Sequence, residues 1–360
     1  MVELKPSFSD QGVGGSHSLL LYSDGTVRSM GINNFGQLGI GDTQNYSTPQ
    51  YVAGLNSVVA VSSGTTFSMA LKTDGTVWGW GDNSSGQLGD GTRSRRTRPV
   101  QVIGLSNVIA ISSSNAHSLA LKSDGTVWGW GNNGSGEIGD GTIINKVKPV
   151  LVANLPDVTA ITCGNYHSVA LKSDGTVWVW GNNIFSQLGD GTNVNQNKPQ
   201  QVPGISNIVS INAGIGHTLA LDSSGFVWAW GDNSSGQLGD GTKSKRTTVV
   251  KVRDMSNIIE VGACAYSSYA LSNDGKVWAW GNNGTGQLGI GTESVSYSLI
   301  PKDVLHDAID ISIESNHWFA LLRDHSVWGC GKNEFGQLGD GTTLKKISPF
   351  ALPLVPSIAY

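Results

Sequence analysis

The chain has 360 residues, of which 49 are glycine and only 14% are charged, and its formal net charge is -4. A composition so rich in glycine and so poor in charge indicates many turns and few long exposed helices, which favours an all-β protein. The slightly acidic balance gives no general attraction to phosphate backbones, so nucleic acid is not an expected partner.

The first residues and the cysteines bear on where the protein works. Met1–Pro6 lacks the basic-then-apolar layout of a secretory signal, and no apolar run of about 18 residues occurs in the chain. The cysteines Cys163, Cys264 and Cys330 are odd in number, which does not indicate a disulfide framework. We expect a soluble cytoplasmic monomer that begins at Met1 and does not insert into membranes. Attachment to a virion or a cell surface without a signal peptide is the alternative.

One stretch, Asp74–Gly81 with the sequence DGTVWGWG, recurs along the chain at an unbroken period of 50 residues. Its first residue returns as Asp24, Asp124, Asp174, Ser224, Asp274 and Asp324. Seven copies at one period identify a repeat protein, and this overrides the two or three domains that the length alone suggests. We expect one domain over residues 1–360.

Each repeat reads as four short strands, and the copy at 57–106 shows their order. Two β-prone runs, 57–62 and 67–72, are joined by a short loop, and an Asp-Gly turn then leads to a third strand at 76–81. A long glycine-rich connection precedes a short fourth strand at 99–102, whose leading proline suits a strand edge or a strand start. Four strands in 50 residues leave no room for a helix.

A single four-stranded sheet cannot cover its own two faces, so the repeats must pack against one another. Radial closure needs no polar caps, and seven four-stranded blades lie within the usual range for a β-propeller. Seven periods take 350 of the 360 residues. The remaining ten let Phe350–Leu354 and Ser357–Tyr360 overlap the register of the N-terminal segment. We therefore expect the two termini to complete one blade and close the ring.

The repeated tryptophans and histidines are interpreted as packing residues. Strand alternation sends Trp78 and Trp80 to one face of the sheet, against small residues of the next blade, which explains them without a stacked cofactor. Equivalent atoms of packed sheets lie about 10 Å apart, too far for a shared zinc ion with ligands at about 2 Å. This argues against a metal ring at the recurring His17, His117, His167, His217 and His317.

No catalytic, cofactor-binding or metal-binding residues are predicted. The repeated Gly89–Thr92 lacks the alternating carboxylates and the closing Glu of a calcium loop. No Ser-His-Asp or Cys-His set stands apart from the repeat, and no phosphate-binding loop precedes a helix. The sequence therefore gives no positive reason to expect an enzyme, and we expect none.

The segments Gly164–Leu171, Asp174–Gly181 and Gln187–Thr192 resemble the repeat of the regulator of chromosome condensation family. The resemblance covers essentially the whole chain and implies a seven-bladed β-propeller. The founding member of the family is a guanine-nucleotide exchange factor for a small nuclear GTPase and uses an inserted wedge and a basic tail. The strict period here leaves no room for a wedge, and no basic tail is present. A bacterial β-lactamase inhibitor of similar fold binds its target through loops on one face and is the better guide.

The loop between strands one and two and the connection after strand three emerge on the same side of a meander, and that side carries most of the variation between copies. Exposed aromatic side chains at variable loops are typical anchors of a protein interface. The candidates are Phe35, Tyr166, Phe185, Tyr266, Trp318 and Phe335. The alternative is that each aromatic ring folds onto its own blade.

Basic residues crowd three of the long connections, and an anionic partner could bind there. They are Arg93, Arg95, Arg96 and Arg98 in copy two, Lys243, Lys245 and Arg246 in copy five, and Lys345 and Lys346 in copy seven. Solvated loops without a ligand are the alternative. Together these features predict a non-enzymatic protein-binding propeller that acts as an adaptor, an inhibitor or an attachment module. Guanine-nucleotide exchange on a small GTPase is the alternative function, implied only by the resemblance.

Overall fold

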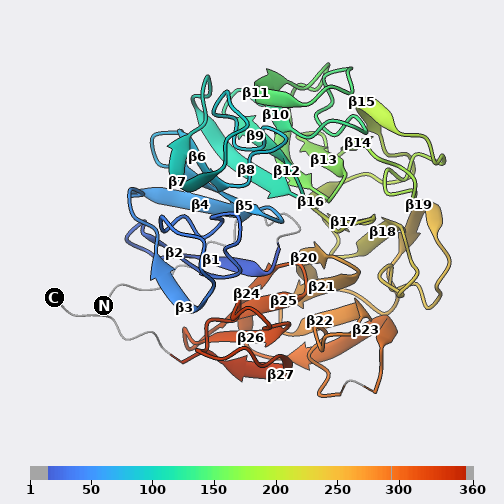
Figure 1. Cartoon of the computed structure of the whole chain (residues 1–360). Coiled ribbons are helices and arrows are strands. Elements are labelled where there is room, and N and C mark those ends of the chain that lie inside the picture. The colour runs from blue at the N-terminus through green and yellow to red at the C-terminus, as the bar shows by residue number, and fades with distance from the viewer. Residues whose placement is uncertain (1–14, 293, 354–360) are drawn as a thin grey trace.

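The computed structural model describes residues 15–292 and 294–353. In this part the chain forms 27 strands and no helix, arranged as seven antiparallel sheets around a central axis (Figure 1). We number the sheets blade 1 to blade 7 in chain order; blade 1 has three strands within the described residues and each of the others has four. The predicted all-β, seven-bladed β-propeller is confirmed. No helix among the described residues has the length and apolar character needed to cross a bilayer.

The strands fall into four layers from the axis outward (Figure 1). The innermost strands are β4 (Val58–Ser63), β8 (Val108–Ser114), β12 (Val158–Cys163), β16 (Ile208–Ala213), β20 (Ile258–Cys264) and β24 (Ala308–Ile313). The second strands are β1 (His17–Leu21), β5 (Phe67–Lys72), β9 (His117–Lys122), β13 (His167–Lys172), β17 (His217–Asp222), β21 (Ser267–Ser272) and β25 (His317–Leu322). The third strands are β2 (Val27–Gly31), β6 (Val77–Gly81), β10 (Val127–Gly131), β14 (Val177–Gly181), β18 (Val227–Gly231), β22 (Val277–Asn282) and β26 (Val327–Gly331). The outer strands are β3 (Tyr46–Tyr51), β7 (Arg96–Gln101), β11 (Lys146–Leu151), β15 (Gln196–Gln201), β19 (Arg246–Lys251), β23 (Tyr297–Leu305) and β27 (Lys346–Ala351).

The outer strand begins earlier than the sequence predicts. The proline pattern predicts a start at Pro99, whereas β7 begins at Arg96. Gly79 pairs with Val100 but Gly81 pairs with Arg96, so the register shifts between them. Pro99 lies inside this irregular stretch, where its missing N–H removes no ladder hydrogen bond. A proline that marks a strand start in a regular ladder therefore marks a bulge here.

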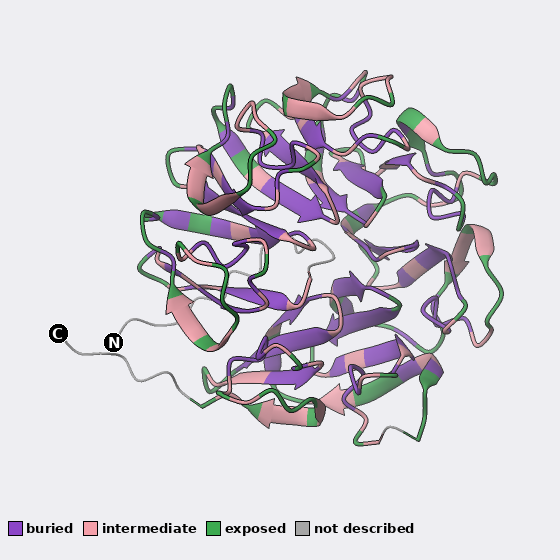
Figure 2. Ribbon diagram, viewed as in Figure 1, coloured by how far each residue is buried: buried purple, intermediate pink, exposed green. Residues whose placement is uncertain are grey.

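The indoles of the third strands pack between blades, as predicted. Trp80 is fully buried, and its Nε1 donates to the main-chain oxygen of Gln37 in the preceding blade over 2.8 Å. A Cβ added at Gly39 would lie 2.7 Å from the same indole nitrogen, so glycine is what lets the two blades approach this closely. Trp78 is partly buried against the same hydrophobic cluster. Inner strands are largely buried and exposed residues gather on loops and outer strands (Figure 2).

The ring closes where blade 7 meets blade 1. Gly341 N donates to Ser47 O over 3.0 Å, and Met30 of blade 1 shares a buried cluster with Phe319 and Leu338 of blade 7. Phe350 pairs with Gly329 inside blade 7. The terminal residues 1–14 and 354–360 lie outside the described residues, so their contribution to a blade stays a prediction.

Candidate protein-binding face

The face that carries the variable loops is built from the connections between first and second strands and between third and outer strands. We call it the loop face. The Asp-Gly turns and the connections between blades lie at the opposite ends of the same strands. Strand direction alone therefore separates a face of repeated turns from a face where the copies differ.

Side-chain hydrogen bonds hold the long connections of the loop face in place. In blade 2, Asn83 donates from Nδ2 to Asp90 Oδ1 over 3.0 Å and to Thr92 O over 3.2 Å. Its Oδ1 accepts from Leu88 N over 3.0 Å. Asn83 is fully buried, so one amide satisfies backbone groups that would otherwise be unpaired. The equivalent asparagines make the same type of bonds in the other copies, and the loop tips are therefore presented by an ordered base.

Arg96, predicted to bind a partner, is engaged within its own blade. Its Nε and Nη2 donate to Asp90 Oδ2 over 2.9 and 2.7 Å. Partial burial raises the pKa of Asp90, but hydrogen bonds from Thr92 and Arg96 outweigh it and the pKa is lowered. Equivalent ion pairs are Lys146–Asp140 at 2.7 Å, Arg246–Asp240 at 2.6 Å and Lys346–Asp340 at 2.8 Å. Arg96 therefore fixes the start of the outer strand, and its role in partner binding stays a prediction.

Arg93 and Arg95, in contrast, are exposed at the tip of the blade 2 connection. Arg95 donates from Nη1 to Asn34 O over 3.2 Å, and its guanidinium lies 4.8 Å from the ring centroid of Phe35. This cation–π contact partly covers Phe35 and holds the charged group at the surface. Phe335 is also partly buried, with the ammonium of Lys332 at 5.7 Å from its ring centroid.

The aromatic residues lie at the junctions between blades. Phe185 of blade 4 lies against Gly216 of blade 5, where an added Cβ would come within 3.1 Å of the ring. The same two positions can be compared at the other junctions. Where the position of Phe185 holds Phe, the position of Gly216 on the next blade holds a small residue, and where the next blade has Tyr there, the first position holds Ser. The pairs are Phe35 with Thr66, Ser135 with Tyr166, Phe185 with Gly216, Ser235 with Tyr266, and Phe335 with Ser16. Five of the seven junctions thus hold one aromatic ring each.

These rings differ in exposure. Tyr166 and Tyr266 are each 40% exposed and Phe185 is 39% exposed, so all three can reach a partner. Phe35 and Phe335 sit at neighbouring junctions and present less surface. The alternative that each ring folds onto its own blade does not describe Phe185, whose contact is with the next blade.

Trp318 is not on the loop face, and its prediction as an exposed rim residue is wrong. It is fully buried on β25, and its Nε1 donates to Gln287 O over 2.9 Å. Its cross-strand partner is Cys330, whereas blades 2 to 6 pair Ser or Thr with Trp at these two positions, as in Ser68 with Trp80. In blade 7 the indole is therefore on the second strand, whereas blades 2 to 6 carry it on the third strand, and it fills the same space between blades. The Cys at the tryptophan position was the sequence signal for this exchange.

Four strongly exposed apolar side chains of the loop face lie on blades 3 and 4, and they were missed from the sequence. Ile143, Ile144, Ile184 and Val194 are 62%, 66%, 57% and 63% exposed. We call these four residues, together with Tyr166 and Phe185, the apolar loop patch. Of the missed residues, Ile143 occupies the loop position of Arg93 and Lys243, whereas the positions of Ile144, Ile184 and Val194 hold serine in copies two and five. A comparison of those positions across the copies would have shown the apolar residues but not their exposure.

Hydrogen bonds join the two blades beneath the apolar loop patch. Asn182 of blade 4 donates from Nδ2 to Ser135 Oγ of blade 3 over 3.2 Å, and its N donates to Tyr166 O over 2.7 Å. Its Oδ1 accepts from Ile184 N over 3.1 Å. In blade 3, Asn133 Nδ2 donates to Ile144 O over 3.3 Å. The loops that carry the patch therefore rest on a hydrogen-bonded base, which the bond from Asn182 to Ser135 joins across the two blades.

Five buried histidines link successive blades. His17 Nε2 lies 2.8 Å from Ser68 Oγ, and that hydroxyl donates its single proton to Gln37 O over 2.8 Å. His17 must therefore carry its proton on Nε2 and donate it. The equivalent contacts are His117–Ser168, His167–Thr218, His217–Ser268 and His317–Ser18. No group of three or more His, Cys, Asp and Glu residues within 15–292 and 294–353 could hold a metal ion.

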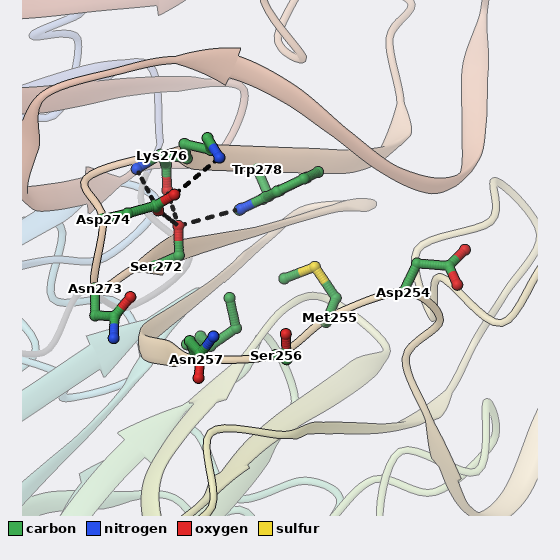
Figure 3. Close-up of a pocket in the computed structure, with 10 residues that line it drawn as sticks. Asp254, Met255, Ser256, Asn257, Ser272, Asn273, Asp274, Lys276 and Trp278 are labelled. Atoms are coloured by element: carbon green, nitrogen blue, oxygen red, sulfur yellow. Dashed lines mark hydrogen bonds and ion pairs between the residues drawn. The ribbon is translucent and has the colours of Figure 1, made fainter.

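A hollow of about 230 Å³ opens on the opposite face at blade 6 (Figure 3). Ser272 Oγ donates to Asp274 Oδ1 over 2.6 Å, Lys276 Nζ lies 2.8 Å from Asp274 Oδ2, and Trp278 Nε1 donates to Ser272 Oγ over 3.4 Å. The side chains of Ser272, Asp274, Lys276 and Trp278 are therefore paired with one another, as the dashed lines of Figure 3 show.

Comparison with known proteins places the chain among propellers of one type. The sequence profile of the RCC1-like domain matches residues 4–305. The structure of human WBSCR16 has a TM-score of 0.83 at 21% identity, over 92% of this chain and 94% of that chain. Yeast RCC1 (Prp20) bound to Kap60 has a TM-score of 0.82 at 19% identity, over 99% and 90%. Prp20p from Saccharomyces cerevisiae has a TM-score of 0.80 at 20% identity, over 99% and 88%. No curated protein matches the sequence.

Proposed function

This chain belongs to the RCC1-like domain family, and we propose that it is a non-enzymatic binding module that holds a protein partner on its loop face. The observation that carries the proposal is the apolar loop patch, in which side chains such as Ile144 and Val194 are more than 60% exposed on an ordered base. Exposed apolar side chains that gather on one part of a surface mark interaction sites, because their transfer from water favours binding.

The presentation of the patch also favours a protein partner. Its residues stand on connections that buried asparagines tie to the blade, so little loop entropy is lost on binding. Tyr166 and Phe185 supply the large rigid side chains that commonly contribute most to interface affinity. The structural relatives support the same class of activity, since yeast RCC1 (Prp20) was solved with Kap60 bound and Prp20p is described with binding to Gsp1p and histones.

A capture experiment tests this function. The full chain is immobilised, exposed to an extract of its native host, and compared with the variants Phe185→Ser and Ile144→Asp. Leu344→Asp is the matched control, because Leu344 is 68% exposed at the same repeat position in blade 7. We expect at least one protein to be retained by the parent and by the control but lost from both patch variants.

The contrary outcomes are equally definite. Retention that is the same for the parent and both patch variants would rule out the apolar loop patch as the binding site. Guanine-nucleotide exchange is the competing function, and it is measured directly as nucleotide release from a panel of small GTPases. Acceleration by the parent, unchanged in the patch variants, would favour that function over the one proposed here.

A further inference from the structure

We propose that the arc of long connections from blade 2 to blade 5 binds an extended segment of a partner protein that is apolar in its centre and acidic toward both ends. This inference rests on the proposed function and specifies the chemistry of the partner. We call the connection tips 93–95, 143–145, 193–195 and 243–245 the binding arc. Their sequences are RSR, IIN, NVN and KSK, so two apolar tips lie between two basic ones.

The basic ends of the binding arc have no carboxylate partners within the described residues. Lys243 lies over the ring of Tyr297 at 3.4 Å, and Arg95 contacts only a main-chain oxygen and an aromatic ring. In contrast, Arg96 and Arg246, each one residue beyond these tips, are ion-paired to Asp90 and Asp240. The structure therefore separates basic side chains that fix the blade from basic side chains that remain available to an external anion.

The basic side chain of Lys245 on blade 5 contacts residues next to the apolar loop patch. Lys245 Nζ donates to Asn193 Oδ1 over 3.1 Å and lies 3.5 Å from Ile184 O. A carboxylate that approached Lys245 would thus belong to a segment whose neighbouring residues lie over Ile184 and Val194. Charge and apolar surface are adjacent here, not on separate parts of the face.

The second blade is joined to the patch from the other side. Gly91 N donates to Val147 O over 3.0 Å, which places the blade 2 connection against the strand that follows Ile143 and Ile144. Arg93 begins two residues after Gly91 and is exposed. The four tips are therefore consecutive along the rim, in the order basic, apolar, apolar, basic.

The length of the arc suits an extended segment. Sheets packed face to face lie about 10 Å apart, and blades that radiate from an axis are further apart at the rim, so three blade steps span at least about 30 Å. At about 3.3 Å per residue, an extended chain of at least about nine residues covers this distance. A partner segment of this length would place apolar side chains over blades 3 and 4 and carboxylates near Arg93, Arg95, Lys243 and Lys245.

The pattern favours an acidic protein segment over a nucleic acid. A phosphate backbone needs basic groups at short, regular intervals, whereas the middle two tips of the binding arc carry no basic residue. Phosphates placed over apolar side chains such as Ile143 and Ile144 would lose hydration without a compensating basic group. A segment with carboxylates only at its ends satisfies both parts of the arc.

Selection from a displayed library of random 12-residue peptides tests this proposal with the full chain as bait. We expect enrichment of peptides with an apolar centre and Asp or Glu at both ends, and weaker binding as salt increases. The variant with Arg93→Glu, Arg95→Glu, Lys243→Glu and Lys245→Glu should bind these peptides at least about tenfold more weakly. Ile144→Asp should also weaken binding, and Leu344→Asp should leave it unchanged.

Each other result has a defined meaning. Enriched peptides without acidic ends, or binding that tolerates the fourfold charge reversal, would overturn the proposal; loss of that binding in Ile144→Asp would still support the proposed function. Failure of the library to yield any peptide sensitive to Ile144→Asp would also overturn it. If sedimentation shows that the parent self-associates and Ile144→Asp does not, the occupant is a second copy of the chain and the proposal is wrong.

Discussion

His317 of blade 7 donates a hydrogen bond from Nε2 to the hydroxyl oxygen of Ser18 in blade 1 over 2.7 Å. The same hydroxyl donates to Gln337 O over 2.9 Å, so the proton must be on His317 Nε2. Its Nδ1 is buried and has no partner within the described residues. Protonation of His317 would therefore create a buried charge and an N–H without an acceptor. The contact that closes the ring requires the neutral imidazole.

The first prediction follows from the same arrangement at His217. Burial lowers the pKa of His217 to about 4, whereas its ordinary value is 6.5. The unfolded chain thus binds the extra proton below pH 6.5 and the folded chain does not until about pH 4, so stability falls as the pH falls through this window. His217→Phe should remove this loss and gain about 2 kcal/mol relative to the parent between pH 7 and pH 5.

Urea denaturation of both proteins at the two pH values measures this difference. The substitution has a precedent in the chain, because Phe67 occupies the same position in blade 2 and lies against Gly64 as His217 lies against Gly214. A stability difference between variant and parent that is the same at pH 7 and pH 5 would contradict the prediction.

The second prediction concerns a carboxyl group that titrates in the opposite sense. Glu314 is 5% exposed, and Ser63 Oγ donates to its Oε2 over 2.7 Å. Burial raises the pKa of Glu314 from 4.5 to about 8. The folded chain then binds the proton between these values and the unfolded chain does not, so stability is lost as the pH rises from about 4.5 to 8.

Glu314→Gln keeps an oxygen acceptor for Ser63 and removes the titration. Relative to the parent it should gain roughly 3 kcal/mol between pH 5 and pH 8, as measured by urea denaturation. Partly buried Glu260 and Asp310, whose pKa values burial raises to about 8 and about 7, remain in both proteins and cancel in the comparison. An equal gain at pH 5 would point to a better packed side chain instead of an uncharged one.

The third prediction uses the exchanged indole of blade 7. Trp318→Ser should remove a fully buried ring and destabilise the fold by about 3 to 5 kcal/mol. Adding Cys330→Trp should recover most of this loss, because Ser opposite Trp is the pair that blade 2 has at Ser68 and Trp80. Urea denaturation of both single variants and the double variant gives the coupling energy. If the changes in unfolding free energy of the two single variants add up to that of the double variant, the two indole positions do not share one interblade space.

The repeat made the fold predictable because seven copies solve the same packing problem. A residue type that is the same in all seven copies, such as the leucine at Leu71, can be predicted from the sequence alone to be buried, and Leu71 is buried. The residue type at Trp318 alone does not reveal its burial, because the compensating change lies across the strand pair at Cys330. Arg96 follows Arg93 and Arg95 in the sequence, but the start of a strand turns its side chain toward Asp90.

The candidate face was predictable in position but not in composition. Strand direction assigns the variable loops to one side, and exposed Tyr166 and Phe185 lie there. The apolar tips at Ile143, Ile144 and Val194 depend on exposure, which loop sequences do not define. Aliphatic side chains in a loop can pack against a blade or remain exposed to water. Which of the two occurs depends on the loop conformation that the hydrogen-bonded base imposes.

The last prediction concerns blade 4, where the ion pair at the start of the outer strand is missing. Asp190 accepts from Asn183 Nδ2 over 3.0 Å and from Thr192 N over 2.9 Å, as Asp90 does from its own neighbours, but the position of Arg96 is held by Gln196. Gln196→Arg should form the pair seen at Arg96 and Asp90 and stabilise the fold by about 0.5 to 1 kcal/mol in low salt. The test is a double-mutant cycle with Asp190→Asn, measured by urea denaturation at low and high salt. A gain from Gln196→Arg that persists in the Asp190→Asn background would show that the arginine acts through its aliphatic stem, which packs along the blade edge, and not through its charge.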